Sequence, residues 1–371
     1  MKNLIAALLG VAVLGGCATT DVEPMKSGGD VRGLTEAEQR VWAEADKSDA
    51  AMQNAGMTYE NAAVTKYLQE VMDRLHPEFR GTIKVRVAKD PQLNAFALPN
   101  GSIYFNLGLL ARLDNEAELA TVLAHEGAHF ILKHGFRQRN NVKNSAAASL
   151  FVGDTLAMSS ISGYSRDLER EADLVGYRRL TKVGYDTRES VKVFRHLARE
   201  AEALGDKGDF FYSSHPKLEE RIEVYEDLNK SKKPGGSVGK QEYVRQIGPL
   251  RLACLESDLS MDRYKSVMLA LGDKARLADY PPQARFYLAE AYLRRGDKGD
   301  EQHAFDAYHA ALKAAPGFAP TYRALGIHHM KKKDYSRAEA YFARYLQLAP
   351  NAPDRDYVKN YRTLAKHGGS K

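Results

Sequence analysis

The sequence of 371 residues predicts a mainly α-helical domain with a small β-sheet, an α+β fold, followed by an all-α domain of helical repeats. Three observations predict this division. A strand–turn–strand pattern at 94–110 precedes an apolar helix at 119–131, a segment rich in Gly, Ser, Lys and Pro interrupts the chain at 231–240, and a repeat of about 34 residues follows it. With 44% hydrophobic and 27% charged residues, the chain is globular and long enough for two domains.

The amino terminus resembles a lipoprotein signal peptide, residues 1–16. A short positive start precedes an apolar run that ends at Leu14 and is too short to span a bilayer permanently. The residues before Cys17 resemble a lipobox, which implies cleavage there, acylation of Cys17 and a lipid anchor. Ala18 replaces the Asp that retains such proteins at the inner membrane of enteric bacteria, so we expect the periplasmic face of the outer membrane. A simple secretory signal is the alternative, and residues 17–33 are expected to form a flexible tether.

Cysteine content and net charge exclude further classes of protein. With Cys17 acylated, Cys254 has no intramolecular partner, so the fold must rest on its core rather than on disulfides. The net charge of +6 and the isoelectric point near 9.0 would suit nucleic acid, but the basic residues are spread among 48 acidic ones. We therefore expect no nucleic-acid partner.

The segment 94–110 predicts two short strands joined by a turn. Pro99-Asn100-Gly101 is a turn sequence, and residues 102–105 favour a strand. An edge strand beside a cleft can pair with an extended polypeptide through its backbone, which would place Asn94 to Phe96 near bound substrate. The alternative is an ordinary structural hairpin.

The run His125-Glu126-Gly127-Ala128-His129 lies in an apolar segment that predicts a buried helix. Residues four apart are about 40° apart around a helix, so both imidazoles can face one metal ion. Glu126 is about 100° from His125, away from the ion but close to a water whose proton it can take. HExxH also occurs by chance, yet a buried His and Glu require partners, which zinc supplies. Gly127 is about 1 kcal/mol less favourable than Ala in a helix, and close approach of a neighbouring backbone is one explanation.

A catalytic zinc takes three protein ligands, so the motif needs a third. His134 is nearest in sequence but lies about 180° from His125 on a continuous helix, so we predict a packed or hydrogen-bonded residue instead. The acidic helix at 165–180 is a better source. Glu169 and Asp173 share one face of it while Glu171 points roughly the other way. The alternative is a solvated, charged helix.

These motifs together resemble one family. HEGAH, the ExxxD pattern from Glu169 to Asp173, and Ser214-His215-Pro216 with Arg221-Ile222 resemble the zinc metallopeptidases of the BepA, LoiP and HtpX type, distant relatives of the CAAX prenyl endopeptidase. The resemblance covers about residues 35–230 and includes the segment 94–110. It implies a gluzincin-type metallopeptidase domain over 34–230.

The resemblance also implies residue roles. His125, His129 and Glu169 would bind one zinc ion per chain, and Glu126 would be the general base. Asp173 would orient a ligand imidazole. His215 would either cover the metal at rest or stabilise the oxyanion, and Arg221 would support the tetrahedral intermediate. Gly127 departs from the family, which more often has an aliphatic residue there.

After the linker 231–240, the chain is almost wholly helical. A tetratricopeptide-like pattern covers 319–350, and a weaker one covers roughly 282–316. The matching packing residues are Tyr322, Leu325, Gly326, Tyr335, Ala338, Phe342 and Pro350, and, in the earlier unit, Leu288, Ala289, Tyr292, Ala304, Tyr308, Ala311 and Pro316. Residues 241–279 and 353–366 would cap the stack. The cluster of His303, His309, His328 and His329 lacks a convergent acidic or cysteine ligand, so we expect packing or surface histidines.

The resulting hypothesis is a zinc endopeptidase, lipid-anchored in the periplasm, that cleaves misfolded or stalled envelope proteins. Residues 241–371 would dock unfolded or misassembled polypeptides, or outer-membrane assembly machinery. The alternative is an assembly chaperone or scaffold that acts through its repeats, with a latent zinc site. A third interpretation is a peptidase whose repeats only stabilise it.

Overall fold

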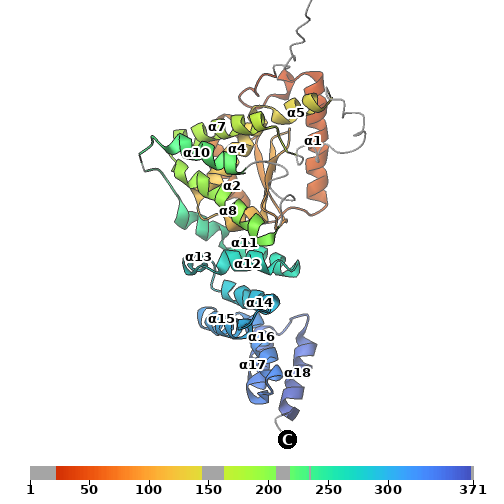
Figure 1. Cartoon of the computed structure of the whole chain (residues 1–371). Coiled ribbons are helices and arrows are strands. Elements are labelled where there is room, and N and C mark those ends of the chain that lie inside the picture. The colour runs from red at the N-terminus through yellow and green to blue at the C-terminus, as the bar shows by residue number, and fades with distance from the viewer. Residues whose placement is uncertain (1–21, 144–162, 206–217, 234, 369–371) are drawn as a thin grey trace, which may run out of the picture.

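The computed structural model describes residues 22–143, 163–205, 218–233 and 235–368, and Figure 1 shows the course of the chain. The amino-terminal elements are η1 (Val31–Gly33), α1 (Glu36–Asn54), α2 (Ala62–Leu75), η2 (Pro77–Phe79), β1 (Lys84–Ala88), β2 (Ala95–Ala97), β3 (Ser102–Asn106), α3 (Leu107–Arg112), α4 (Glu116–Ile131), α5 (His134–Lys143), α7 (Arg166–Val183), η4 (Thr187–Glu189), α8 (Ser190–Leu204) and α10 (Leu218–Asn229).

The carboxy-terminal elements are α11 (Lys240–Ser260), α12 (Tyr264–Leu271), α13 (Lys274–Ala278), α14 (Ala284–Arg295), α15 (Asp300–Ala314), α16 (Ala319–Lys331), α17 (Tyr335–Leu348) and α18 (Arg355–Gly368). These helices extend in a column from the first domain (Figure 1). The predicted fold class, an α+β domain followed by helices, is confirmed.

The sheet has three strands in the order β1-β3-β2. β1 runs parallel to β3, and β2 runs antiparallel to it with Ala97 opposite Ile103. Gly101 in the turn between β2 and β3 has φ +85°, a conformation that favours glycine. The predicted hairpin is confirmed, and β2 lies at an edge of the sheet.

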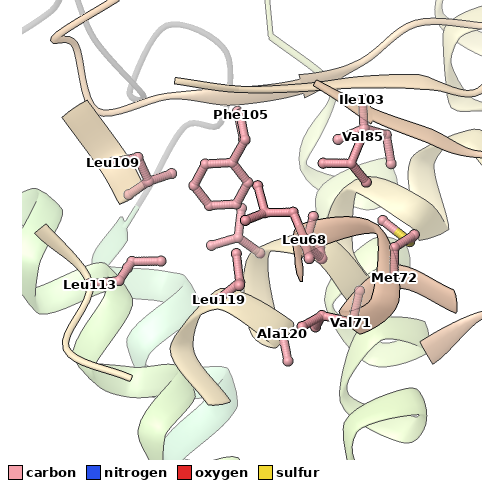
Figure 2. Close-up of a cluster of buried hydrophobic side chains, with 14 of the residues drawn as sticks. Leu68, Val71, Met72, Val85, Ile103, Phe105, Leu109, Leu113, Leu119 and Ala120 are labelled. Atoms are coloured by element: carbon pink, nitrogen blue, oxygen red, sulfur yellow. The ribbon is translucent and has the colours of Figure 1, made fainter. Parts of the chain in front are cut away.

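Helices α2 and α4 bury their apolar faces against the sheet. Leu68 and Met72 from α2, Val85 from β1, Phe105 from β3 and Leu119 from α4 belong to one core, whose packing Figure 2 shows. Each such side chain stabilises the fold by roughly 1.5–3 kcal/mol when fully buried. This core fixes the position of α4 relative to β2.

Helix α7 packs directly on α4. A Cβ at Gly176 of α7 would lie 3.3 Å from backbone atoms of Ala124 and His125, so glycine permits the close approach of the two helices. The first turn of α4 is fixed by Asn115, whose side-chain oxygen accepts from the Glu118 N–H at 3.0 Å. The two helices that carry the sequence motifs are therefore held against each other by backbone proximity.

Part of the segment expected to be a tether packs against this domain. The backbone N–H of Met25, a buried residue, donates to Ile131 at the end of α4 at 2.7 Å, and the N–H of Gly28 donates to Glu78 at 2.8 Å. Composition predicted a flexible chain here, but these backbone bonds and the buried Met25 dock it. The signal peptide and Cys17 lie outside the described residues.

Helix α11 shares the core of the first domain. Tyr243, Ile247 and Cys254 are fully buried in it, and the Tyr243 hydroxyl donates to the Leu110 carbonyl at 2.6 Å. The segment interpreted as a linker is also attached, since Ser237 donates to Gly184 at 2.8 Å. A Gly- and Ser-rich composition indicates the absence of a helix, not the absence of contacts, so the compact unit extends through α11.

A buried ion cluster joins α11 to the first domain. The Arg112 guanidinium from α3 donates to Asp258 of α11 at 2.7 Å and to both oxygens of Glu200 of α8 at 3.3 Å. All three side chains are at most 5% exposed. Within the described chain Cys254 is a free thiol beside this cluster, and burial raises its pKa.

The last helices form two hairpins, α14 with α15 and α16 with α17, followed by α18. A Cβ at Gly326 would lie 2.5 Å from the Phe342 ring, so the second hairpin requires glycine where its helices meet. The expected packing residues Leu325, Ala338 and Phe342 are fully buried. Among the described helices, none combines the length and apolar character needed to cross a membrane.

Candidate metal centre

Helices α4 and α7 bring two imidazoles and one carboxylate together. The Nε2 atoms of His125 and His129 are 3.0 Å apart. Glu169 of α7 places one oxygen 3.4 Å from His125 Nε2 and the other 3.3 Å from His129 Nε2. All three side chains are at most 4% exposed. The structure thus assembles the three predicted ligands; their role as ligands remains a prediction.

The donor set fits a zinc ion. Ligand atoms about 2.0–2.2 Å from a tetrahedral zinc lie roughly 3.3 Å from one another, which matches the three separations above. Two neutral imidazoles and one carboxylate are a ligand set found in catalytic zinc sites. The residues therefore suit the metal, with the His-His-Glu set buried beneath the surface of the domain.

A second acidic and histidine group lies at Asp114, Glu118 and His196. His196 Nε2 is 3.3 Å from an oxygen of each carboxylate, and Arg276 pairs with Asp114 at 3.1 Å. Burial lowers the pKa of His196, but hydrogen bonding to both carboxylates outweighs it and raises the pKa above its usual range. We interpret this group as a buried ion-pair cluster.

Asp173, one helical turn after Glu169, supports the first imidazole. Its Oδ1 lies 2.9 Å from His125 Nδ1, the position predicted for a residue that orients this ring. Burial alone would raise the pKa of Asp173, but the charges of Arg221 and His125 hold it below the usual value. Asp173 is therefore an ionised carboxylate behind the ligand.

Charge balance around His125 favours a cation. Burial and the charge of Arg221 lower the pKa of His125, while the carboxylates of Asp173 and Glu169 raise it more strongly, to about 9. The site thus stabilises positive charge at this imidazole, which is the sign of charge that a zinc ion provides.

Arg221 of α10 is bound to the same carboxylates. Its guanidinium donates to both oxygens of Asp173, at 2.6 and 2.9 Å, and Nη1 lies 3.3 Å from Glu169. It also lies over the Phe194 ring, 4.5 Å from its centre. This geometry holds the carboxylates in place; the predicted role at the tetrahedral intermediate remains a prediction.

His134 supports the second imidazole, a role that the sequence did not indicate. α4 ends at Ile131, Lys133 has φ +53°, and the turn brings His134 Nδ1 to 2.8 Å from His129 Nδ1. Burial lowers the pKa of His134 to about 3. His134 is packed and hydrogen-bonded, as predicted. The prediction assumed one continuous helix from His125 to His134, however, and α4 ends before His134.

The other predicted site residues have mixed outcomes. Glu126 is fully buried in α4 and outside the ligand group. Glu171 is outside the ligand group, and its Oε2 lies 2.6 Å from Arg137 and 3.4 Å from Nε2 of His134. His215 lies outside the described residues. Ala97 at the end of β2 lines a small cavity together with His129. The predicted docking role of Asn94 to Phe96 remains a prediction.

Gly127 is explained by a side chain rather than by a neighbouring backbone. A Cβ at this position would lie 2.6 Å from Nε2 of His76 at the end of α2. The imidazole of His76 occupies that space, is 1% exposed, and has its pKa lowered by burial to about 4. A neutral histidine thus fills the space beside Gly127.

The buried His-His-Glu group, with a glutamate in the same helix turn, has the arrangement of an HExxH metallopeptidase site. Comparison with known proteins agrees with this pattern: residues 58–229 match the model of peptidase family M48. The resemblance deduced from the sequence is confirmed.

Individual relatives agree. The chain is 34% identical over 158 residues to the mitochondrial metalloendopeptidase OMA1 of Arabidopsis thaliana, covering 39% of this chain and 31% of that protein. It is 29% identical to a putative beta-barrel assembly-enhancing protease of Vibrio cholerae (44% and 35% covered) and 27% identical to the metalloprotease YcaL of Escherichia coli (61% and 98%). The alignments cover less than half of the OMA1 relatives in the plant and the two yeasts.

Proposed function

We propose that this protein is a zinc-dependent endopeptidase that acts on unfolded or misassembled proteins of the bacterial envelope. The observation that carries the proposal is the buried group of His125, His129 and Glu169, with ligand atoms 3.0–3.4 Å apart, inside an M48 domain. Zinc in such a site supplies Lewis acidity for attack on a peptide carbonyl.

The chain's own residues divide the remaining work. Glu126 takes a proton from the attacking water on its carboxylate and passes it to the leaving amine. Asp173 accepts a hydrogen bond from His125 Nδ1–H, which turns Nε2 of that ring toward Glu169. His134 Nδ1 accepts a hydrogen bond from His129 Nδ1–H, which turns Nε2 of His129 toward Glu169 as well. Arg221 keeps Asp173 ionised. His215 would lie near the metal.

Substrate docking is assigned to the edge strand β2. β2 lies at one edge of the three-stranded sheet, whose order is β1-β3-β2. An extended polypeptide added there would bind mainly through main-chain hydrogen bonds, which demand no particular sequence. That property suits an enzyme acting on unfolded chains.

Location and substrate class rest on the sequence and the relatives. The lipobox-like residues before Cys17 favour a lipid anchor at the periplasmic face of the outer membrane. Two of the relatives are named for enhancement of beta-barrel assembly. We therefore assign misfolded or stalled outer-membrane proteins as substrates, with the tetratricopeptide-like helices α14–α18 as the docking module for them or for assembly machinery.

The second candidate is a chaperone or scaffold with a latent site. It is favoured by the column of helices α14–α18, which extends beyond the peptidase core and offers a separate surface (Figure 1). Genetic complementation separates the candidates. Full rescue by Glu126→Gln, with loss of rescue on deleting 284–371, would favour the scaffold; the opposite pattern would favour a peptidase stabilised by its repeats.

The biochemical test is cleavage of an unfolded outer-membrane protein. The wild type should cleave it, and Glu126→Gln should keep its zinc and lose cleavage by a factor of at least about 100. Undiminished cleavage by Glu126→Gln would overturn the proposed mechanism.

A further inference from the structure

We propose that Tyr164 is a positioning residue that fixes the ring of the zinc ligand His129. This inference rests on the proposed zinc site and concerns a residue to which neither the motif nor the family comparison gives a role. The Tyr164 ring stacks on the His129 ring with centroids 4.0 Å apart and an interplanar angle of 14°. The side chain is 6% exposed, so the contact is buried.

A hydrogen bond and an edge-on ring contact also act on His129, and neither of them by itself prevents the ring from tilting. The bond to His134 at Nδ1 constrains the ring at one edge, and the His125 ring meets it edge-on at 84° with centroids 4.6 Å apart. Rotation about that hydrogen bond would still tilt the ring out of its plane and move Nε2. A stacked aromatic ring blocks this tilt, because the tilt would drive the two faces together.

The backbone around Tyr164 is anchored to α5 and to the start of α7. The carbonyl of Gly163 accepts from the Gln138 side chain of α5 at 3.0 Å, and Ser165 caps the start of α7. The same helix carries Glu169 one turn later. The stacking ring and the third ligand therefore share one helix end, and their positions relative to His129 are set together.

Tyr164 also connects the ligand with the edge strand. Together with His129 it lines a small cavity to which Ala97, the last residue of β2, and the following Leu98 and Pro99 also contribute. By stacking on it, the Tyr164 ring covers one face of the His129 imidazole and keeps water away from that face. A smaller side chain would admit water there and give His129 alternative orientations.

The test compares three substitutions of one residue. Tyr164→Phe keeps the ring and removes the hydroxyl, whereas Tyr164→Leu and Tyr164→Met remove the ring and keep an apolar volume. Tyr322→Leu in α16 is the matched control for the loss of a tyrosine ring. For each purified full-length protein the zinc dissociation constant is measured by competition with a chromophoric chelator, and the visible spectrum of the Co²⁺-substituted protein reports ligand geometry.

We expect Tyr164→Phe and Tyr322→Leu to bind zinc within about 2-fold of the wild type. We expect Tyr164→Leu and Tyr164→Met to bind it about 10-fold or more weakly, the size of effect seen when support of a ligand is lost, with an altered Co²⁺ spectrum. Thermal unfolding of the metal-free proteins separates loss of folding from loss of positioning, and Tyr164→Met serves if Tyr164→Leu fails to fold.

Three outcomes would overturn the proposal. Wild-type affinity and spectrum in both ring-less variants would show that stacking does not position His129. Equal weakening in Tyr164→Phe would assign the effect to the hydroxyl instead. A wild type that binds no zinc would overturn the proposed function as well, whereas the first two outcomes would overturn only the role of Tyr164.

Discussion

The imidazole of His76 occupies the space that a side chain at position 127 would fill, since a Cβ on Gly127 would lie 2.6 Å from His76 Nε2. The C-terminal end of α2 is thereby packed against the centre of the HEGAH turn. The backbone of α4 that presents the two ligand imidazoles is supported from behind by a neutral, buried histidine.

Gly127→Ala should therefore destabilise the protein although alanine is the better helix former. Overpacking of a buried site costs about 1–3 kcal/mol, against a gain of about 1 kcal/mol from helix propensity. In a His76→Ala background the same change should be neutral or stabilising. Urea unfolding of the four proteins of this cycle measures the coupling, and a Gly127→Ala single variant more stable than the wild type would contradict the packing.

Acid should weaken the fold through His76. Burial lowers its pKa in the folded protein to about 4, from an ordinary value near 6.5. Between these values the unfolded chain binds a proton that the folded protein does not, so stability falls as the pH falls from about 7 to 4. The contribution is about 3 kcal/mol, from roughly 1.4 kcal/mol per pKa unit.

The measurement is the free energy of unfolding in urea against pH. His76→Leu should show a flatter profile between pH 7.5 and 4 than the wild type, whatever its absolute stability. His367→Leu, a change of an exposed histidine, should leave the profile unchanged. Identical profiles for the wild type and His76→Leu would rule out a depressed pKa at His76.

Asp173→Asn should weaken zinc binding about 10- to 100-fold, because His125 loses the carboxylate that orients its Nδ1–H. It should also destabilise the fold by about 3–5 kcal/mol, since Arg221 would remain buried without its bidentate partner. Asp167→Asn on the exposed face of the same helix is the control. Unchanged zinc affinity in Asp173→Asn would remove Asp173 from the site's support.

Arg112→Met tests how much the buried ion cluster between α11 and the first domain contributes to the free energy of unfolding. It removes the closer of the two cations that contact the buried carboxylates of Asp258 and Glu200, and leaves only Arg263 beside them, a loss of about 3 kcal/mol. Arg245→Met, which removes an exposed pair with Glu242 on α11, should change stability by less than about 1 kcal/mol. Similar losses in both variants, measured by denaturant unfolding, would show that the cluster does not hold α11 in place.

Local sequence predicted the parts of the site that one helix supplies. His125, Glu126 and His129 follow from helical spacing, and Glu169 and Asp173 from a shared face of a second helix together with the family resemblance. The hairpin before α4 followed from turn chemistry at Gly101. These features depend on periodicity and on turns, which a single sequence records.

Features that depend on tertiary contact could not be predicted. His134 reaches His129 only because α4 stops at Ile131 and Lys133 adopts positive φ, for which the sequence gives no signal. His76 opposite Gly127 is a contact between distant segments. The 231–240 segment was assigned as a linker from composition, although Ser237 bonds to Gly184 and the following helix α11 shares the core of the first domain.

The central claim is that Glu126 acts as the general base beside a zinc ion to which it is not a ligand. The most direct measurement is zinc content together with cleavage of an unfolded outer-membrane protein, for the wild type, Glu126→Gln and Glu169→Gln. We predict one zinc per chain in the wild type and in Glu126→Gln, cleavage only in the wild type, and loss of both zinc and cleavage in Glu169→Gln. Cleavage by Glu126→Gln at the wild-type rate, or full zinc in Glu169→Gln, would contradict this account.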